Sequence, residues 1–92
     1  MLELADKAFQ AVRNSKLEQL EEYLEEGIDI GSRDNNGNTL LLVAAQQGSK
    51  KLVKFLLRRG AVLTDQNFAG NSVLHYTFQY HFEDLALSLI HI

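Results

Sequence analysis

Residues 34–48 decide the fold, and they read DNNGNTLLLVAAQQG. Much of this pattern returns 33 residues later, where residues 67–81 read NFAGNSVLHYTFQYH. Gly37 and Gly70 fall on the same 33-residue spacing, as do a second pair of glycines and two pairs of leucines. A period in the low thirties is typical of arrays of supersecondary units that bury a core only by stacking on one another. The sequence therefore predicts a repeat array with an extended surface.

The apolar residues recur at helical spacing, and clusters of turn-forming residues separate them. Asn36 and Gly37 suit a tight turn within the loop that precedes the central helix. Thr39 is placed to cap that central helix, and Asn14 or Ser15 to cap an earlier one. The predicted helices are a helix–turn–helix pair over 4–26 and single helices over 40–47, 50–59, 72–80 and 82–92.

These residues resemble an ankyrin repeat. Residues 34–48 match the start of the repeat, and the Leu-Val, Leu-Leu and Gly-Ala pairs within 52–61 match its end. Leu74 and His75 keep the Leu-His pair of the family's Thr-Pro-Leu-His motif. The resemblance implies an all-α, ankyrin-like solenoid of stacked helix–turn–helix pairs with hairpin-like loops.

The period divides the chain, whose 92 residues suit one small domain. The resemblance implies a single ankyrin repeat domain over 1–92 with three units. These are an N-terminal helical cap unit over 1–33, a full repeat over 34–66 and a clipped C-terminal repeat over 67–92. An array of about two and a half repeats fits a truncated or an engineered chain.

Some positions depart from the family pattern. The family's proline is replaced by Leu40 and Val73, and its histidine by Leu42 in the central unit. We therefore expect one helix-to-loop hydrogen bond to be missing beside Leu42. The resemblance implies that His75 makes this bond to loop backbone in the next unit.

The composition and the motifs argue against catalysis and against cofactor, metal, nucleic-acid or membrane binding. A net charge of −3 lacks the strongly basic balance of nucleic-acid binders, and no apolar run is long enough to cross a membrane. The chain has no cysteine, no histidine–carboxylate cluster at metal-ligand spacing, no phosphate loop and no nucleophile elbow. We expect no catalytic residues, no cofactor, no metal, no nucleic-acid partner and no membrane partner. The expected location is cytoplasmic or nuclear.

Two charged helices are expected to lie side by side. Glutamates crowd residues 18–26, and lysines and arginines crowd residues 50–59. In a stacked array these helices are neighbours, so acidic and basic faces are expected to meet across the junction. Exposed pairs of this kind are worth only about 0.2–1 kcal/mol each.

The resemblance implies binding of a protein partner through loop tips and through the exposed side of the first helix in each unit. Phe68 either points outward as an interface hot spot or folds back onto its own loop. Arg13 and Asn14 extend the surface into the first unit. The expected partner-binding residues are Arg33, Asn35, Asn36, Asn38, Gln46, Gln47, Gln66, Phe68, Asn71, Gln79 and Tyr80.

The last helix suggests a second hypothesis. Leu87 aligns with Lys54 and Ile92 with Arg59, so positions that are charged in one unit are aliphatic in the next. An apolar end of this kind fits a chain cut from a longer array, or self-association through Leu87, Ile90 and Ile92. The expected function is non-catalytic protein–protein interaction, with a self-assembling homo-oligomer as the alternative.

Overall fold

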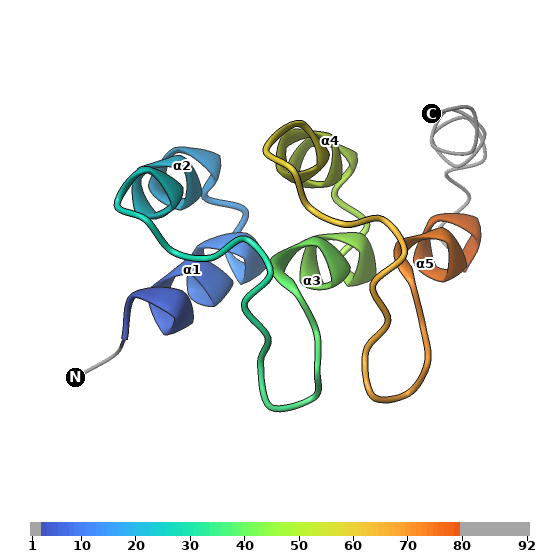
Figure 1. Ribbon diagram of the computed structural model, residues 1–92. Helices are drawn as coiled ribbons and strands as arrows, with labels where there is room; N and C mark the ends of the chain where they lie inside the picture. Colours follow the sequence, from blue (N-terminus) through green and yellow to red (C-terminus); the bar gives the residue numbers. More distant parts are fainter. Residues whose placement is uncertain (1–2, 80–92) are drawn as a thin grey trace.

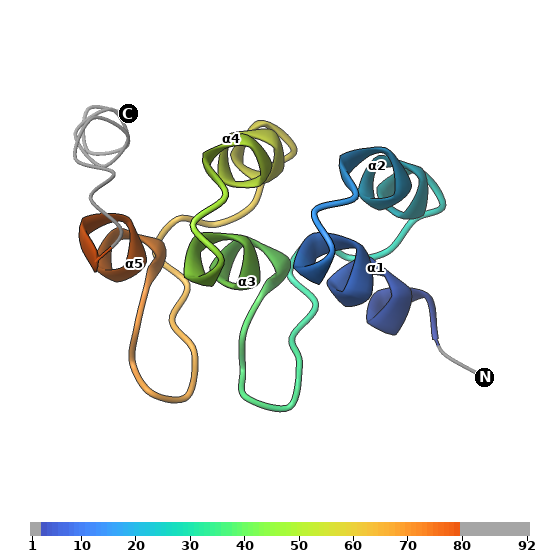
Figure 2. The same cartoon turned by 180° about the vertical axis from the view of Figure 1, so that it is seen from behind.

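The computed structural model describes residues 3–79, and the predicted helix over 82–92 lies outside them. The helices of the described part are α1 (Leu4–Arg13), α2 (Leu17–Glu25), α3 (Leu40–Gln46), α4 (Lys50–Arg58) and α5 (Val73–Gln79). Helices α1, α3 and α5 lie in one row, and α2 and α4 lie above them in a second row (Figure 1). Figure 2 shows the same two rows from behind. The predicted all-α array of stacked helix pairs is confirmed.

Helix α3 is the centre of the core. Its residues 40–45 are all buried, because α1 packs on one side, α5 on the other and α4 behind. A seven-residue helix is too short to be stable alone in water, so tertiary packing must hold it. Burying one leucine side chain is worth about 1.5–3 kcal/mol. The neighbours contribute the remaining core residues, which are Ala8, Phe9, Ala11, Val12, Leu20, Leu52, Val53, Leu56 and Val73.

The helix caps partly follow the prediction. Thr39 Oγ1 accepts the Leu42 N–H at 3.2 Å and caps α3 as expected, and Ser49 caps α4 in the same way. The predicted cap at α2 was wrong. The N-cap of α2 is Lys16, which makes no side-chain cap bond, and Ser15 adopts a positive φ of 55°. The linker between the two helices is short, and the backbone N–H groups of Asn14 and Ser15 donate to carbonyls of α1. Neither residue is therefore placed to cap α2.

Two hairpin-like loops project from the α1–α3–α5 row, away from α2 and α4 (Figure 1). We name residues 33–39 the first finger and residues 66–72 the second finger. An isolated antiparallel bridge joins Arg33 to Thr39 at the base of the first finger. The fingers are the hairpin-like loops predicted from the turn-forming residues.

Each finger is closed by the side chain of its second residue. Asp34 Oδ1 accepts the backbone N–H groups of Asn36 and Asn38, each at 2.9 Å. Asn67, 33 residues later, accepts two N–H groups through Oδ1 at 3.0 and 3.1 Å. A side-chain oxygen that satisfies two turn N–H groups favours this conformation over an extended loop. Both fingers are therefore shaped by the same arrangement, in which one side-chain oxygen accepts two backbone N–H groups.

The Tyr76 hydroxyl joins the second finger to α3 and α5. It lies 3.1 Å from Asn67 Nδ2, 3.2 Å from Gln46 Nε2 and 3.3 Å from Asn71 Nδ2. Asn38 Oδ1 completes the network by accepting from Gln46 at 2.8 Å and from Asn67 at 2.9 Å. An amide at position 67 can donate these bonds, whereas the carboxylate of Asp34 cannot.

The prediction that His75 bonds to loop backbone stays a prediction, because the residues that follow α5 lie outside the described part of the chain. The His75 side chain is exposed, and among the described residues it packs edge-to-face on Tyr76, with ring centroids 5.3 Å apart. The described residues include no loop beyond α5 that His75 could reach. Tyr76, one residue later, makes the link between helix and finger in this unit.

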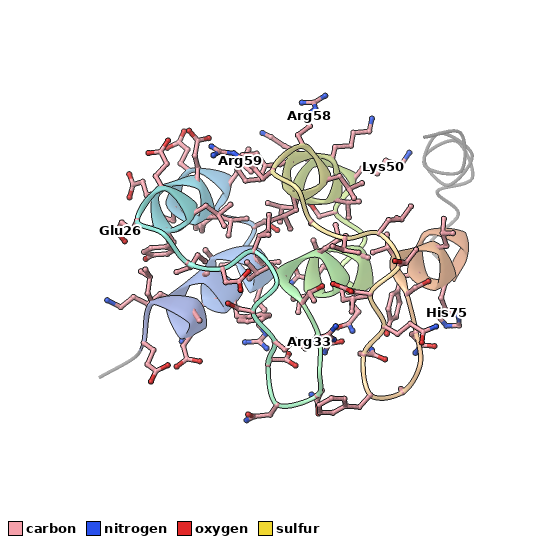
Figure 3. All side chains as sticks on the ribbon, viewed as in Figure 1. Glu26, Arg33, Lys50, Arg58, Arg59 and His75 are labelled. Carbon is pink, nitrogen blue, oxygen red and sulfur yellow. The ribbon has the colours of Figure 1, made fainter. Side chains whose placement is uncertain are left out.

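The charged helices meet as expected. Arg59 Nη2 lies 4.0 Å from Glu21 Oε1 across the junction between α4 and α2. The Arg59 guanidinium also lies over the Phe55 ring, 5.3 Å from its centroid. Figure 3 shows Arg59 directed toward α2, whereas Arg58 points outward. Because both partners are well exposed, this pair contributes little to stability.

The Tyr76 network predicts how the stability changes when a substitution removes only the hydroxyl oxygen of Tyr76. Tyr76→Phe removes the hydroxyl that lies within hydrogen-bond distance of three half-buried amides, so we expect the free energy of unfolding to fall by about 1–2 kcal/mol. Tyr23→Phe is the matched control, because within the described residues the Tyr23 hydroxyl makes no hydrogen bond. Urea unfolding of both variants measures the difference. Equal loss in the two variants would contradict the role of the network.

Candidate functional site

The fingers project at an angle from the α1–α3–α5 row (Figure 1), and we take the fingers together with the adjoining sides of these helices as one candidate surface. Between α1 and the first finger this surface is hollowed, with a volume of about 420 Å³. We name this depression the hollow. Its lining residues are Asp6, Phe9, Gln10, Arg13, Arg33, Asp34, Asn35 and Asn36.

Phe68 lies at the tip of the second finger and bridges to the first. Its backbone N–H donates to the Asn36 carbonyl at 3.1 Å, and its ring lies against Gly37. A Cβ atom added to Gly37 would come within 2.5 Å of Phe68 Cδ1. Even so, Phe68 stays 78% exposed. The ring therefore packs on the neighbouring finger, not on its own loop, and leaves most of its surface open.

Arg33 fastens the two fingers at their bases (Figure 3). Its Nη1 donates to the Gly37 carbonyl at 2.6 Å and to the Gln66 carbonyl at 2.9 Å. Its Nη2 lies 3.7 Å from Asp65 Oδ1. Charge-assisted bonds to two carbonyls and a carboxylate hold the fingers as one body. Much of the Arg33 guanidinium is thus used to position the surface.

Arg13 forms the wall of the hollow at the C-terminal end of α1. Its guanidinium lies over the Phe9 ring, 5.9 Å from the centroid, and its Nη2 is 3.5 Å from Asp34 Oδ2. The Arg13 side chain is 51% exposed, whereas Asp34 is 13% exposed. The Arg13 carbonyl accepts the Gln47 side-chain N–H at 2.8 Å, which ties α1 to α3.

The structure separates the predicted partner-binding residues into two groups. Asn38 is only 6% exposed, and its side chain, like those of Gln46 and Asn71, is engaged in the Tyr76 network. These three amides stabilise the shape of the surface through hydrogen bonds within the chain. The exposed residues of the prediction are Arg33, Asn35, Asn36, Gln47, Gln66 and Phe68.

Other predicted residues fall outside what the structure describes. They are the Gln79 side chain, Tyr80 and the proposed self-association residues Leu87, Ile90 and Ile92. Sequence reasoning also missed part of the hollow, namely Asp6, Phe9 and Gln10 on α1. Their spacing relative to Arg13 places all four on one helix face, and that spacing is the signal that could have found them.

A family model described as ankyrin repeats in three copies matches residues 8–92. This chain belongs to the ankyrin repeat family. The match extends the resemblance read from residues 34–48 over most of the sequence. Ankyrin repeats generally mediate protein–protein interaction and are typically non-catalytic.

Individual ankyrin repeat proteins are similar to large parts of the chain. An ankyrin repeat protein of Acanthamoeba polyphaga mimivirus is 29% identical over 92% of this chain and 12% of its own length. The phosphocholine transferase AnkX of Legionella pneumophila is 34% identical over 74% of this chain and 7% of its own length. Ankyrin repeat domain-containing protein 29 of Homo sapiens is 42% identical over 63% of this chain and 20% of its own length.

The chain thus spans between 7% and 20% of the length of these relatives. The transferase activity in the name of AnkX belongs to that protein, of which the match covers a small part. Within residues 3–79, no helix has the length and apolar character needed to cross a membrane.

The contact between Phe68 and Gly37 generates a prediction with an internal control. Gly37 and Gly70 occupy equivalent turn positions, with φ of 77° and 82°, so alanine is strained at both by about 1–2 kcal/mol. A Cβ on Gly70 meets nothing within 4 Å, whereas a Cβ on Gly37 meets the Phe68 ring. We expect Gly37→Ala to lower the free energy of unfolding by about 1 kcal/mol more than Gly70→Ala.

The difference between the two glycine variants is measured by urea unfolding. In a Phe68→Ala background the two substitutions are expected to cost the same, because the ring is gone. A difference that persists without the ring would show that Phe68 is not its cause.

Proposed function

We propose that this ankyrin repeat chain binds a protein partner through the fingers and the adjoining faces of the α1–α3–α5 row, and that it does so without catalysis. Two properties of the surface support this. Its exposed side chains offer hydrogen-bonding groups and an aromatic ring, and its backbone is held rigid from behind. The proposed contact residues are Arg33, Asn35, Asn36, Gln47, Gln66 and Phe68.

The observation that carries the proposal is the exposure of Phe68. An aromatic side chain that is 78% exposed offers apolar area that a partner can bury. Aromatic residues are enriched among interface hot spots, and rigid ones lose little conformational entropy on binding. The Phe68 N–H bond to the Asn36 carbonyl and the contact of its ring with Gly37 place this side chain before a partner binds.

The network behind the surface supports the same function. The second finger is tied to α3 and α5 through Tyr76, and to the first finger through Arg33. A partner that binds across both fingers therefore meets a preformed surface. Gln79 and Tyr80, the next positions along α5 and beyond, stay predicted extensions of this surface.

Site-specific photo-crosslinking tests the proposal. A photoreactive residue is placed at exposed Asn35 in the first finger or, as a matched control, at exposed Lys54 on α4 in the outer row. In cells that naturally express the protein, we expect a partner to crosslink at position 35 and not at position 54. Crosslinking to the same protein from position 54 alone would overturn the proposal.

The captured partner then allows a quantitative test. Phe68→Ala is expected to weaken its binding at least tenfold, because a buried aromatic anchor is lost. Lys54→Ala is expected to leave the affinity within twofold. Isothermal titration calorimetry measures both values. Unchanged affinity in Phe68→Ala would remove Phe68 from the interface.

Self-association through the predicted helix over 82–92 is kept as a second function because of one sequence observation. Leu87 and Ile92 stand where Lys54 and Arg59 stand in the preceding unit. If this helix joins two copies, the chain is a dimer or larger, and Leu87→Lys returns it to a monomer. Light scattering over a concentration series measures the mass. A monomeric chain before the substitution would rule this function out.

A further inference from the structure

We infer that the outer row, α2 and α4, is a self-complementary charged surface through which two copies of this chain associate, with α2 of each copy opposite α4 of the other. The fingers project from the α1–α3–α5 row away from α2 and α4 (Figure 1). This second surface is therefore separate from the partner site proposed above, and it does not involve the predicted helix over 82–92.

The charges of the outer row are reversed from one unit to the next. At four pairs of positions 33 residues apart, the first unit has glutamate and the second has lysine or arginine. Helix α2 contains no cation and helix α4 contains no anion. Because the two units share one backbone plan, equivalent side chains leave their helices in similar directions. The pairs are Glu18 and Lys51, Glu21 and Lys54, Glu25 and Arg58, and Glu26 and Arg59.

Most of these charges have no counter-charge within the described part of the chain. Among the eight side chains, the structure pairs only Arg59 with Glu21, with Nη2 and Oε1 4.0 Å apart. The other six are exposed and, within residues 3–79, make no ion pair and no side-chain hydrogen bond. They are Glu18, Glu25, Glu26, Lys51, Lys54 and Arg58.

The like charges within each helix repel one another. Glu21 and Glu25 are four residues apart, and so are Lys54 and Arg58. Like charges at this spacing are neighbours on a helix surface and destabilise the helix. An occupant relieves the repulsion in both helices only if it brings cations to α2 and anions to α4 at the same time.

A second copy of the chain supplies this pattern. Helices α2 and α4 lie side by side (Figures 1 and 2), and the start of α4 lies beside the start of α2, since Lys51 and residues 15–19 line one surface depression. A two-fold axis between the helices and parallel to them therefore places α2 opposite α4 of the second copy in the same register. Glu18 then faces Lys51 of the second copy, Glu25 faces its Arg58, and the symmetry repeats each contact.

The small size of the surface determines how strong the association is. Each of the two helices has nine residues and is about 14 Å long, so the contact is smaller than the interface of a stable dimer. Exposed ion pairs contribute little each and are screened by salt. We therefore expect a weak dimer with a strongly salt-dependent dissociation constant. Because the fingers of both copies stay uncovered, this dimer offers two sites to a bivalent partner.

Sedimentation equilibrium of the whole chain tests the association. Between about 0.01 M and about 1 M salt, the screening length falls from about 30 Å to about 3 Å. We expect dimers at low salt and a dissociation constant at least tenfold larger at high salt. A chain that stays monomeric at low salt and about 1 mM protein would overturn the inference. A dimer that salt does not weaken would also overturn it and would favour the apolar helix over 82–92.

Two triple variants reverse the six unpaired charges and leave the pair of Glu21 and Arg59 intact. The acidic variant carries Lys51→Glu, Lys54→Glu and Arg58→Glu. The basic variant carries Glu18→Lys, Glu25→Lys and Glu26→Lys. Each variant alone is expected to be monomeric, because most of the charges that face each other then have the same sign. An equal mixture is expected to form a mixed dimer, since the acidic surface of one variant meets the basic surface of the other.

Recovery in the mixture separates the dimer contact from damage to the fold, which mixing cannot repair. Dimerisation of either variant alone, or no association in the mixture, would overturn the inference. A single substitution with a matched control excludes a mere effect of net charge. Arg58→Glu is expected to weaken the dimer at least tenfold, and Lys7→Glu, the same charge change at an exposed position of α1, to alter it less than twofold.

The proposed function stands or falls independently, since it depends on crosslinking at Asn35 and on Phe68. A photoreactive residue at position 54 is expected to capture a second copy of the chain, whose mass distinguishes it from a partner protein. A monomeric chain whose partner crosslinks at position 35 would uphold the proposed function and reject the dimer.

Discussion

The burial of α3 between its neighbours is the constraint on which the rest of the structure depends. This helix has no polar face over residues 40–45, so it cannot meet water on any side. It must be covered by α1, α4 and α5, and this requirement places the helix pairs in register. Each finger is connected to helices of the α1–α3–α5 row, so the spacing between the two fingers follows from the packing of these helices (Figure 1). The binding surface is thus a consequence of how the core is closed.

Repetition made the fold predictable. The 33-residue spacing of Gly37 and Gly70, the apolar run of α3 and the Thr39 cap each report local physics that repeats from unit to unit. The same periodicity placed Asn35, Asn36 and Gln66 on exposed loops, where the structure has them. Within each unit these features depend on residues close in the sequence, so a local pattern that recurs from unit to unit was enough to predict them.

Contacts between units were not predictable from such patterns. Asn38 was expected at the surface, but it is 6% exposed, and its Oδ1 accepts from Gln46 and Asn67, which both also bond to the Tyr76 hydroxyl of the following unit. Phe68 packs on Gly37 of the preceding finger, a contact between residues 31 positions apart. In each case the outcome depends on which side chain of a neighbouring unit fills a given space, and the sequence of one unit does not contain that information.

The amide at position 67 limits how the units of this array can be rearranged. Asn67 donates to Asn38 and Tyr76, whereas the equivalent Asp34 only accepts. If a copy of residues 34–66 stood in the third position, a carboxylate would face the Asn38 oxygen and Val43 would stand in place of Tyr76. Although the two units share a backbone plan, they are therefore not interchangeable modules. Each unit carries polar groups that match those of one particular neighbour, so the hydrogen bonds at the junction fix the order of the units.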